Sequence, residues 1–288
     1  MTDFTTIAVI GAGTMGHGIA YVAALAGHRV RLADADAGTL ERGMQRIRGS
    51  FDTAIAKGKC SAALRDAALA ALEPRTSAVD AARDTDLVIE AVPEQLELKQ
   101  RLLRELEPVV AGGAVLASNT SSLSITAIGS ALERPERVIG MHFFNPVPIM
   151  KLLELVRGER TTDLVVDRAR AFAERIGKTP IVVRDTPGFA TSRLGVVLGL
   201  EAIRMLEQGV ASAEDIDRAM ELGYNHPMGP LRLTDLVGLD VRLAIAEHLH
   251  ATLGDDTYRP PALLRRLVAE GRLGKKSGQG FYRWETNA

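Results

Sequence analysis

The sequence has almost no cysteine and no excess of either charge, and both features exclude classes of protein. Its 288 residues include one cysteine, Cys60. A lone cysteine cannot close an intramolecular disulfide, and Cys60 lies outside every motif described below, so we interpret it as incidental. Lys and Arg total 35 against 36 for Asp and Glu, a formal net charge of −1. Nucleic-acid-binding domains usually carry a basic excess or stripe, so no nucleic-acid partner is expected.

Long apolar runs are also missing. No run approaches the ~18 residues that cross a bilayer, so no membrane association is expected. Residues 1–4 lack the basic and apolar regions of a secretory signal peptide. These features are typical of a cytoplasmic protein. No motif predicts a metal site.

The order of expected strands and helices predicts two domains, which suits the chain length. Through the first two-thirds, short apolar runs alternate with helical stretches, as in a Rossmann-type doubly wound sheet with right-handed crossovers. Strands are expected at residues 7–10, 29–32, 87–89, 114–117, 138–141, 152–156 and 180–183, and helices at 15–26, 38–57, 61–72, 94–107 and 162–176. Beyond these, only helices are expected, at 190–207, 212–221, 232–252 and 260–270. We therefore expect an α/β domain at 1–186 and an all-α domain at 187–288.

Three glycines follow the first expected strand in the pattern G-x-G-x-x-G: Gly11, Gly13 and Gly16. In a dinucleotide-binding turn the first glycine permits the tight turn, the second lets the backbone approach the pyrophosphate, and the third lets helix and strand pack closely. The helix N-terminus offers amides to the phosphates, so Thr14 and Met15 belong to the predicted cofactor site. A glycine-rich turn can also serve only to turn the chain, but this one lies between a strand and a helix.

Asp34 follows the second expected strand, where a carboxylate can accept hydrogen bonds from the adenosine ribose hydroxyls. It would repel a 2′-phosphate, and the next three residues supply no arginine to offset that repulsion. Arg31 precedes Asp34 but is expected to point away from the ribose. The sequence therefore favours NAD over NADP.

A serine, a histidine and a glutamate downstream form a candidate catalytic group: Ser121, His142 and Glu154. An imidazole can take a proton near neutral pH, a carboxylate can orient it, and a hydroxyl can hold the reacting oxygen. Beside a nicotinamide these groups suffice to oxidise a secondary alcohol. The alternative interpretations are a core histidine bonded to a backbone carbonyl, an outward-facing glutamate, and serines that cap the next helix.

The segments that carry these residues resemble the L-3-hydroxyacyl-CoA dehydrogenase family. Residues 117–123 read Ala-Ser-Asn-Thr-Ser-Ser-Leu, 140–148 read Gly-Met-His-Phe-Phe-Asn-Pro-Val-Pro, and 275–282 read Lys-Lys-Ser-Gly-Gln-Gly-Phe-Tyr. The resemblance runs from the glycine turn to the last of these segments. It implies that His142 takes the hydroxyl proton, that Glu154 pairs with His142, and that Ser121 contacts both substrate and cofactor.

The same resemblance assigns further binding residues. It places Glu94, Lys99, Asn145 and Lys276 near NAD, although Glu94 and Lys99 taken alone would read as a solvated helix face. On the helix after the second strand, Ser50 and Lys57 match a serine and a lysine that touch coenzyme A. Their spacing puts them two turns apart on one helix face. The helical domain is expected to close over the substrate and to pair subunits in a symmetric homodimer.

One position departs from the family pattern. After the interdomain linker the family has Pro-Gly-Phe-x-x-Asn-Arg, whereas residues 187–193 read Pro-Gly-Phe-Ala-Thr-Ser-Arg. Ser192 thus replaces an asparagine that lies at the family's active site. Its hydroxyl is shorter than an amide, and a water molecule could fill the gap. The change concerns substrate preference and turnover, and leaves His142 and Glu154 untouched.

These observations predict NAD-dependent oxidation of L-3-hydroxyacyl-CoA to 3-ketoacyl-CoA, and the reverse, with short chains such as 3-hydroxybutyryl-CoA. One alternative is a sugar-acid dehydrogenase of the gulonate type, from the same superfamily. Ser50 with Lys57 favours the acyl-CoA substrate over it. The other alternative is a non-catalytic NAD-binding protein, against which the joint presence of Ser121, His142 and Glu154 argues.

Overall fold

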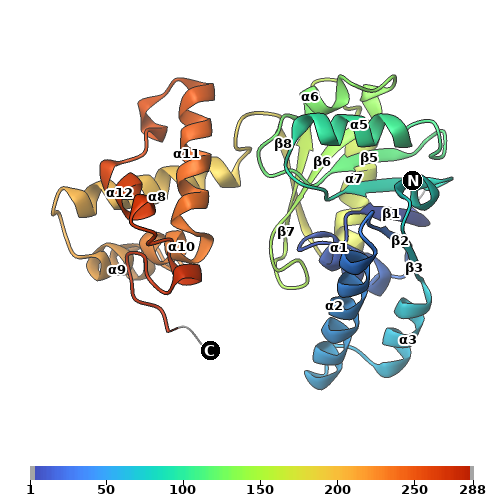
Figure 1. The fold of residues 1–288 in the computed structure, drawn as a ribbon, viewed down its shortest axis with the longest axis horizontal. Coiled ribbons are helices and arrows are strands. Elements are labelled where there is room, and N and C mark those ends of the chain that lie inside the picture. Colours follow the sequence, from blue (N-terminus) through green and yellow to red (C-terminus); the bar gives the residue numbers. More distant parts are fainter. Residues whose placement is uncertain (1–3, 286–288) are drawn as a thin grey trace. The chain divides into compact units, whose positions relative to one another are not determined.

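The polypeptide changes character after residue 186, where alternating strands and helices give way to helices. The computed structural model describes residues 4–285; residues 1–3, part of the segment without signal-peptide features, and 286–288 lie outside the described part. The chain divides into two units, Met1–Thr186 and Pro187–Ala288, and each is described by itself (Figure 1).

An eight-stranded sheet forms the centre of the first unit, in the order β3-β2-β1-β4-β5-β6-β7-β8. The strands are β1 (Thr6–Ile10), β2 (Arg29–Ala33), β3 (Leu72–Arg75), β4 (Leu87–Glu90), β5 (Val115–Ser118), β6 (Val138–Phe143), β7 (Leu152–Arg157) and β8 (Thr179–Arg184). The central strands β1, β4, β5 and β6 are buried on both faces apart from Thr6, which explains their continuous apolar sequences. The predicted Rossmann-type sheet is confirmed.

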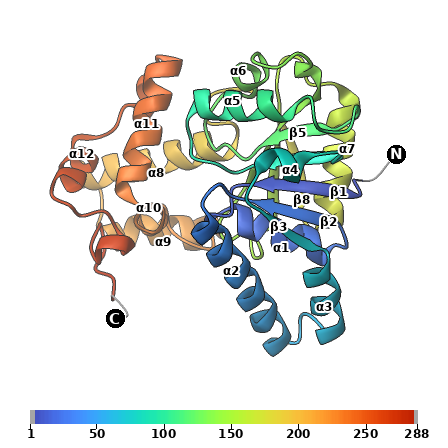
Figure 2. The ribbon, with the colours of Figure 1, turned by 45° about the vertical axis from the view of Figure 1, so that its right-hand side comes forward.

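Helices cover this sheet, as Figures 1 and 2 show. They are α1 (Gly16–Leu25), α2 (Ala37–Ala56), α3 (Ala62–Ala70), α4 (Ala78–Ala82), α5 (Leu96–Leu106), α6 (Ile125–Gly129) and α7 (Asp163–Arg175), with a 3₁₀ turn at Pro135–Arg137. The side chain of Asp36 caps α2, which buries Leu40, Met44, Ile47 and Phe51 at helical spacing. In both views α2 and α3 lie side by side and extend beyond the sheet.

The sheet differs from a purely parallel one at β6 and β7, which pair antiparallel. Strands β7 and β8 are parallel to each other, so both run against the rest of the sheet. The eight residues 144–151 that join β6 to β7 contain no helix, and a parallel crossover needs a longer connection. The sequence also failed to predict β3 and α4. β3 is an edge strand of four residues that includes Pro74, and proline is tolerated at such an edge.

The second unit is built from five α-helices: α8 (Thr191–Glu207), α9 (Ala213–Gly223), α10 (Pro230–Val237), α11 (Leu239–Leu253) and α12 (Ala262–Ala269). Two 3₁₀ turns lie at Asp256–Tyr258 and Lys275–Ser277. The single helix expected at 232–252 was wrong, because Gly238 has φ +104° and separates α10 from α11. Through residue 285 this unit has only isolated β-bridges, which confirms the all-α expectation.

None of the helices in the described part of the chain is long and apolar enough to cross a membrane.

Candidate active site

In the turn between β1 and α1, close packing requires glycine at two positions, and a third glycine faces open space. A Cβ on Gly11, which has φ +102°, would lie 2.6 Å from the Ala91 carbonyl oxygen, and one on Gly16 would lie 1.6 Å from the Gly11 carbonyl oxygen. These two glycines are required by the backbone itself. A Cβ on Gly13 would have no heavy atom within 4 Å. The space beside Gly13 therefore suits the close approach of a pyrophosphate.

The start of α1 lies beside this open position. Met15 is its N-cap residue, no side chain caps the first turn, and no acidic residue lies there. Thr14 immediately precedes Met15 in the turn. The helix dipole and the first-turn amides thus meet no competing carboxylate from the helix itself.

Asp34 lies at the end of β2 beside the glycine turn. Its Oδ2 accepts from the Ala12 amide at 2.9 Å and its Oδ1 from the Asp36 amide at 3.0 Å. A carboxylate has about four acceptor sites, so each oxygen keeps capacity for a ribose hydroxyl. Arg31 donates to the carbonyl of Arg83, at the end of α4, at 2.6 Å and lies near Glu73 of β3. These two contacts hold its side chain. The turn, the helix start and Asp34 together fit a dinucleotide.

The structure brings His142 and Glu154 together. They are register partners on the antiparallel strands β6 and β7, so their side chains emerge on the same face of the sheet. The His142 Nδ1 lies 2.7 Å from Glu154 Oε2. Glu154 is fully buried and His142 is 8% exposed. An ionised carboxylate only accepts, so Nδ1 donates and the neutral ring carries its lone pair on Nε2.

Ser121 lies in the turn after β5, the strand next to β6. The residues of this turn converge on Glu94, whose Oε1 accepts from Thr120 Oγ1 at 2.5 Å and from the Ser121 amide at 3.0 Å. The Ser122 amide and the two serine hydroxyls lie 3.3–3.4 Å from the same oxygen. The helix-capping alternative applies to Ser124, which caps α6 through the Ala127 amide. Ser124, and not Ser121, is therefore the residue that caps the next helix.

Lys99 and Glu94 do not form the solvated helix face that their sequence alone would suggest. Lys99 is fully buried, with its Nζ 2.7 Å from Glu90 Oε1 and 3.3 Å from Glu94 Oε2. Burial opposes ionisation of Glu94, but the hydrogen bond from Thr120 and the charge of Lys99 hold its pKa below the ordinary value. Burial raises the pKa of Glu90, against the charge of Lys99 and the hydrogen bonds from Lys99 and Ser118.

Ser50 and Lys57 line one cavity of about 730 Å³ in the first unit, between α1, α2 and the β6–β7 connection. Ser50 Oγ also donates to the Arg46 carbonyl at 2.9 Å. The cationic side chains around the cavity are Arg46, Lys57, Lys59, Lys151 and Lys178. No carboxylate from the described residues lines it. Such a cavity suits a ligand that carries several phosphates.

Three further predicted residues, Asn145, Ser192 and Lys276, are described each within its own unit. Asn145 is exposed in the connection after β6. Ser192 lies in the first turn of α8, and Lys276 forms an ion pair of 2.6 Å with Asp240, both within the second unit. Their proposed roles stay predictions.

Sequence reasoning missed Glu90 and Lys178. Glu90 ends the apolar strand β4, and a carboxylate in that position needs a partner, which was the available clue. Lys178 donates to the carbonyls of Val147 and Met150 and so holds the β6–β7 connection. Burial lowers the pKa of Lys178. Nothing in the sequence pattern marked this lysine.

Comparison with known families agrees with this geometry. Residues 6–186 match the model of the 3-hydroxyacyl-CoA dehydrogenase NAD-binding domain, and residues 188–284 match the C-terminal domain of the same family. The chain belongs to the 3-hydroxyacyl-CoA dehydrogenase family. The family resemblance and the NAD cofactor predicted from the sequence are confirmed.

Curated and solved 3-hydroxyacyl-CoA dehydrogenases match the chain over nearly its whole length. A probable 3-hydroxybutyryl-CoA dehydrogenase of Deinococcus radiodurans is 47% identical, with 96% of this chain and 99% of the relative covered. A 3-hydroxybutyryl-CoA dehydrogenase of Bradyrhizobium diazoefficiens is 45% identical, with 96% and 94% covered. The crystal structure of (S)-3-hydroxybutyryl-CoA dehydrogenase from Ralstonia eutropha superposes with a TM-score of 0.95 at 42% identity, covering 99% and 100%.

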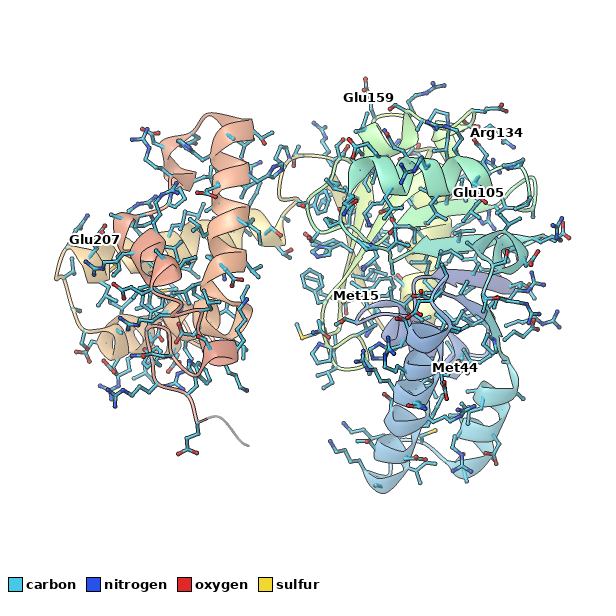
Figure 3. The ribbon with its side chains drawn as sticks, viewed as in Figure 1. Met15, Met44, Glu105, Arg134, Glu159 and Glu207 are labelled. Atoms are coloured by element: carbon cyan, nitrogen blue, oxygen red, sulfur yellow. The ribbon has the colours of Figure 1, made fainter. Side chains whose placement is uncertain are left out.

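Among residues 4–285, this dehydrogenase has no cluster of three or more His, Cys, Asp or Glu side chains that could hold a metal. A second cavity of about 340 Å³ lies under α6 and is lined in part by Glu159. In Figure 3, Glu159, Arg134 and Glu105 lie along the α5–α6 side of the first unit, whereas Met15 and Met44 lie by α1 and α2. The cavity under α6 is thus separate from the glycine turn.

Proposed function

We propose that this dehydrogenase oxidises L-3-hydroxyacyl-CoA to 3-ketoacyl-CoA with NAD, and catalyses the reverse reaction, with 3-hydroxybutyryl-CoA among its substrates. The observation that carries the proposal is the buried pair of His142 and Glu154 on a dinucleotide-binding sheet. The names of the relatives from Deinococcus and Bradyrhizobium support the short acyl chain.

In the proposed reaction the cofactor takes the hydride, and side chains of the protein bind the cofactor and transfer the proton. When bound, NAD supplies the hydride acceptor for C3 of the substrate. Gly13 and the start of α1 hold the pyrophosphate, and Asp34 holds the adenosine ribose. His142 accepts the hydroxyl proton at Nε2 during oxidation and returns it during reduction. Glu154 fixes the Nδ1–H tautomer and stabilises the imidazolium.

Ser121 completes the proposed site as a donor to the substrate oxygen. Its amide is held by Glu94, so the hydroxyl is presented from a fixed turn. A hydrogen bond to the oxygen as charge develops on it favours the transition state over the ground state. The resemblance implies a role in the reaction for Ser192, which stands in the place of the family asparagine.

The cavity beside Ser50 and Lys57 supports coenzyme A as the carrier. Coenzyme A has a 3′-phosphate and a diphosphate, which match a cavity with four cationic side chains besides Lys178, whose ammonium holds the β6–β7 connection. A free sugar acid has a single carboxylate and would leave most of these cations unpaired. A non-catalytic NAD-binding protein would need neither this cavity nor the His142–Glu154 pair.

A homodimer and a cytoplasmic location are part of the proposal. Exposed apolar side chains of the second unit support self-association, since Leu194 on α8 is 72% exposed and Leu222 on α9 is 83% exposed. Sedimentation of the purified chain at several concentrations would measure the oligomeric state.

The decisive experiment compares carriers of the same acyl group. NADH oxidation is followed with acetoacetyl-CoA, with the acetoacetyl thioester of N-acetylcysteamine, which lacks the phosphates, and with free acetoacetate. We expect kcat/KM to fall by about a hundredfold or more without the nucleotide, or roughly 2.7 kcal/mol. Equal rates with all three would contradict the coenzyme A assignment, and activity on a sugar acid alone would favour the alternative dehydrogenase. Longer 3-ketoacyl-CoAs in the same assay give the chain-length preference.

A further inference from the structure

The connection between β6 and β7, residues 144–151, forms one wall of the cavity beside α1 and α2. Pro146, Pro148 and Ile149 of this connection line the cavity. The connection contains neither helix nor strand, so no ladder of the sheet fixes its backbone. Its shape must therefore come from bonds within the connection and from contacts with neighbouring elements.

Hydrogen bonds within the connection and a close contact with α1 define its path. The amides of Ile149 and Met150 both donate to the Pro146 carbonyl, each at 3.0 Å. Gly18 of α1 approaches Val147 so closely that a Cβ on Gly18 would lie 2.9 Å from the Val147 Cβ. Residues 146–150 are thus a turn packed against the helix that starts at the glycine turn.

Lys178 supplies the further support of this turn. Its ammonium donates to the carbonyls of Val147 and Met150, and the residue is 7% exposed. One ammonium thus joins two carbonyls that lie three residues apart in the turn. Lys178 also lines the cavity, where solvent can accept its third N–H.

The backbone of Lys178 is anchored by α7 and by the sheet. Its amide donates to the Ala173 carbonyl at 2.8 Å, and Gly177 before it has φ +74°, as in the Schellman motif that ends many helices. Thr179, the next residue, begins β8. Lys178 therefore extends from a rigid base to a turn that has no secondary structure of its own.

We propose that Lys178 is a positioning residue, which holds residues 146–150 in the shape of the cavity wall and so favours acyl groups carried on coenzyme A. The carrier part of this proposal rests on the proposed function, in which the cavity receives the nucleotide of coenzyme A. The geometric part concerns only the turn and does not depend on that function. Positioning differs from a direct effect of charge, because two N–H groups of Lys178 are already bonded to backbone carbonyls.

The test variant is Lys178→Met, which keeps a long side chain and removes the ammonium. Hydrogen exchange at the amides of Ile149 and Met150 should become about tenfold faster or more, because the turn that they close is no longer held. The Kd for free coenzyme A, measured by calorimetry, should rise by about tenfold. The kcat/KM with acetoacetyl-CoA should fall by about as much, through KM and not kcat.

Two measurements in the same variant should change little. The kcat/KM with the acetoacetyl thioester of N-acetylcysteamine, which lacks the nucleotide, should stay within about threefold. The Kd for NADH should also stay within about threefold, because the glycine turn and Asp34 are untouched.

Lys59 provides the matched control, because it lines the same cavity and is exposed. Lys59→Met removes one cation from the cavity and leaves the turn as it is. It should weaken coenzyme A binding in a salt-dependent manner, but exchange at Ile149 and Met150 should match the wild type. Lys178→Gln keeps two N–H donors and should lie between the wild type and Lys178→Met. If methionine prevents folding, Lys178→Gln against Lys59→Met decides the question.

Two results would overturn the inference. One is unchanged exchange at Ile149 and Met150 in the Lys178 variants. The other is an equal loss of kcat/KM with the two thioesters, which would show that the turn has no bearing on the carrier. A wild type inactive on acetoacetyl-CoA would instead contradict the proposed function, and exchange and coenzyme A binding would still decide the role of Lys178.

Discussion

Replacing Glu154 by glutamine removes one charge from the centre of the proposed site and keeps the shape of the side chain. Glu154 is fully buried, and its Oε2 lies 2.7 Å from His142 Nδ1. A hydrogen bond to a charged group contributes about 1.5–3 kcal/mol, which corresponds to roughly 10- to 150-fold in rate. The amide oxygen of glutamine can still accept from Nδ1. We therefore expect kcat to fall toward the lower part of this range, about 10- to 30-fold.

The same change should slow the reaction in both directions. The Glu154 carboxylate stabilises the imidazolium. In the oxidation of 3-hydroxybutyryl-CoA the imidazolium forms as His142 takes the hydroxyl proton, and in the reduction of acetoacetyl-CoA it is the proton donor. Glu154→Gln should therefore lower kcat for both reactions.

The assay follows NADH at saturating substrate in both directions. His142→Ala is the reference variant and should lose roughly 10²–10⁴ in kcat, the usual contribution of a general base. NADH binding should change little in either variant. An unchanged kcat in Glu154→Gln would refute the reasoning, since a carboxylate that orients and stabilises the imidazole cannot be neutralised without effect.

Four further variants test the cofactor site and the departure from the family pattern. Gly13→Ala should fold with an unchanged melting temperature but bind NADH at least about tenfold more weakly, because its Cβ would enter only the space kept for the pyrophosphate. Gly11→Ala, whose Cβ would meet the Ala91 carbonyl, should instead lower the melting temperature. Equal melting curves for the two variants would contradict this distinction. Asp34→Ala should weaken NADH binding and reduce discrimination against NADPH, and a wild type that already uses both cofactors equally would show that Asp34 has another purpose. Ser192→Asn should change kcat/KM by about tenfold or less, or roughly 1.4 kcal/mol, and unequally for short and long 3-ketoacyl-CoAs; a wild type inactive on every acyl-CoA but active after this change would mean that serine disables the chemistry.

The sequence predicted the parts of the fold that depend on local pattern. Apolar runs located the central strands, and the spacing of apolar residues located α2 and α7 to within about two residues. It could not predict the direction of β7, because strand direction depends on the path of the connection at 144–151 and not on the composition of the strand. The break between α10 and α11 at Gly238 was also missed, since a glycine within a helical pattern is often tolerated.

The sequence likewise predicted one part of the candidate site and missed another. His142 and Glu154 were paired on grounds of chemistry and resemblance, and the antiparallel register of β6 and β7 supplies the geometric reason. Lys99 could not be recognised as buried, because a lysine on an amphipathic helix usually faces solvent. Its burial depends on Glu90, which follows an apolar run on another element. Such a pairing exists only once β4 and α5 are packed.

The reversal of direction at β7 makes the pairing of His142 with Glu154 a local property of the chain. Because His142 and Glu154 lie on neighbouring strands joined by eight residues, they align whenever those two strands pair. The proposed acid–base pair is thus fixed by the pairing of β6 with β7 and makes no demand on the sequence after residue 186. A substitution in the helical unit, such as serine for asparagine at position 192, can therefore change the preference for the acyl chain and leave the pairing of His142 with Glu154 intact.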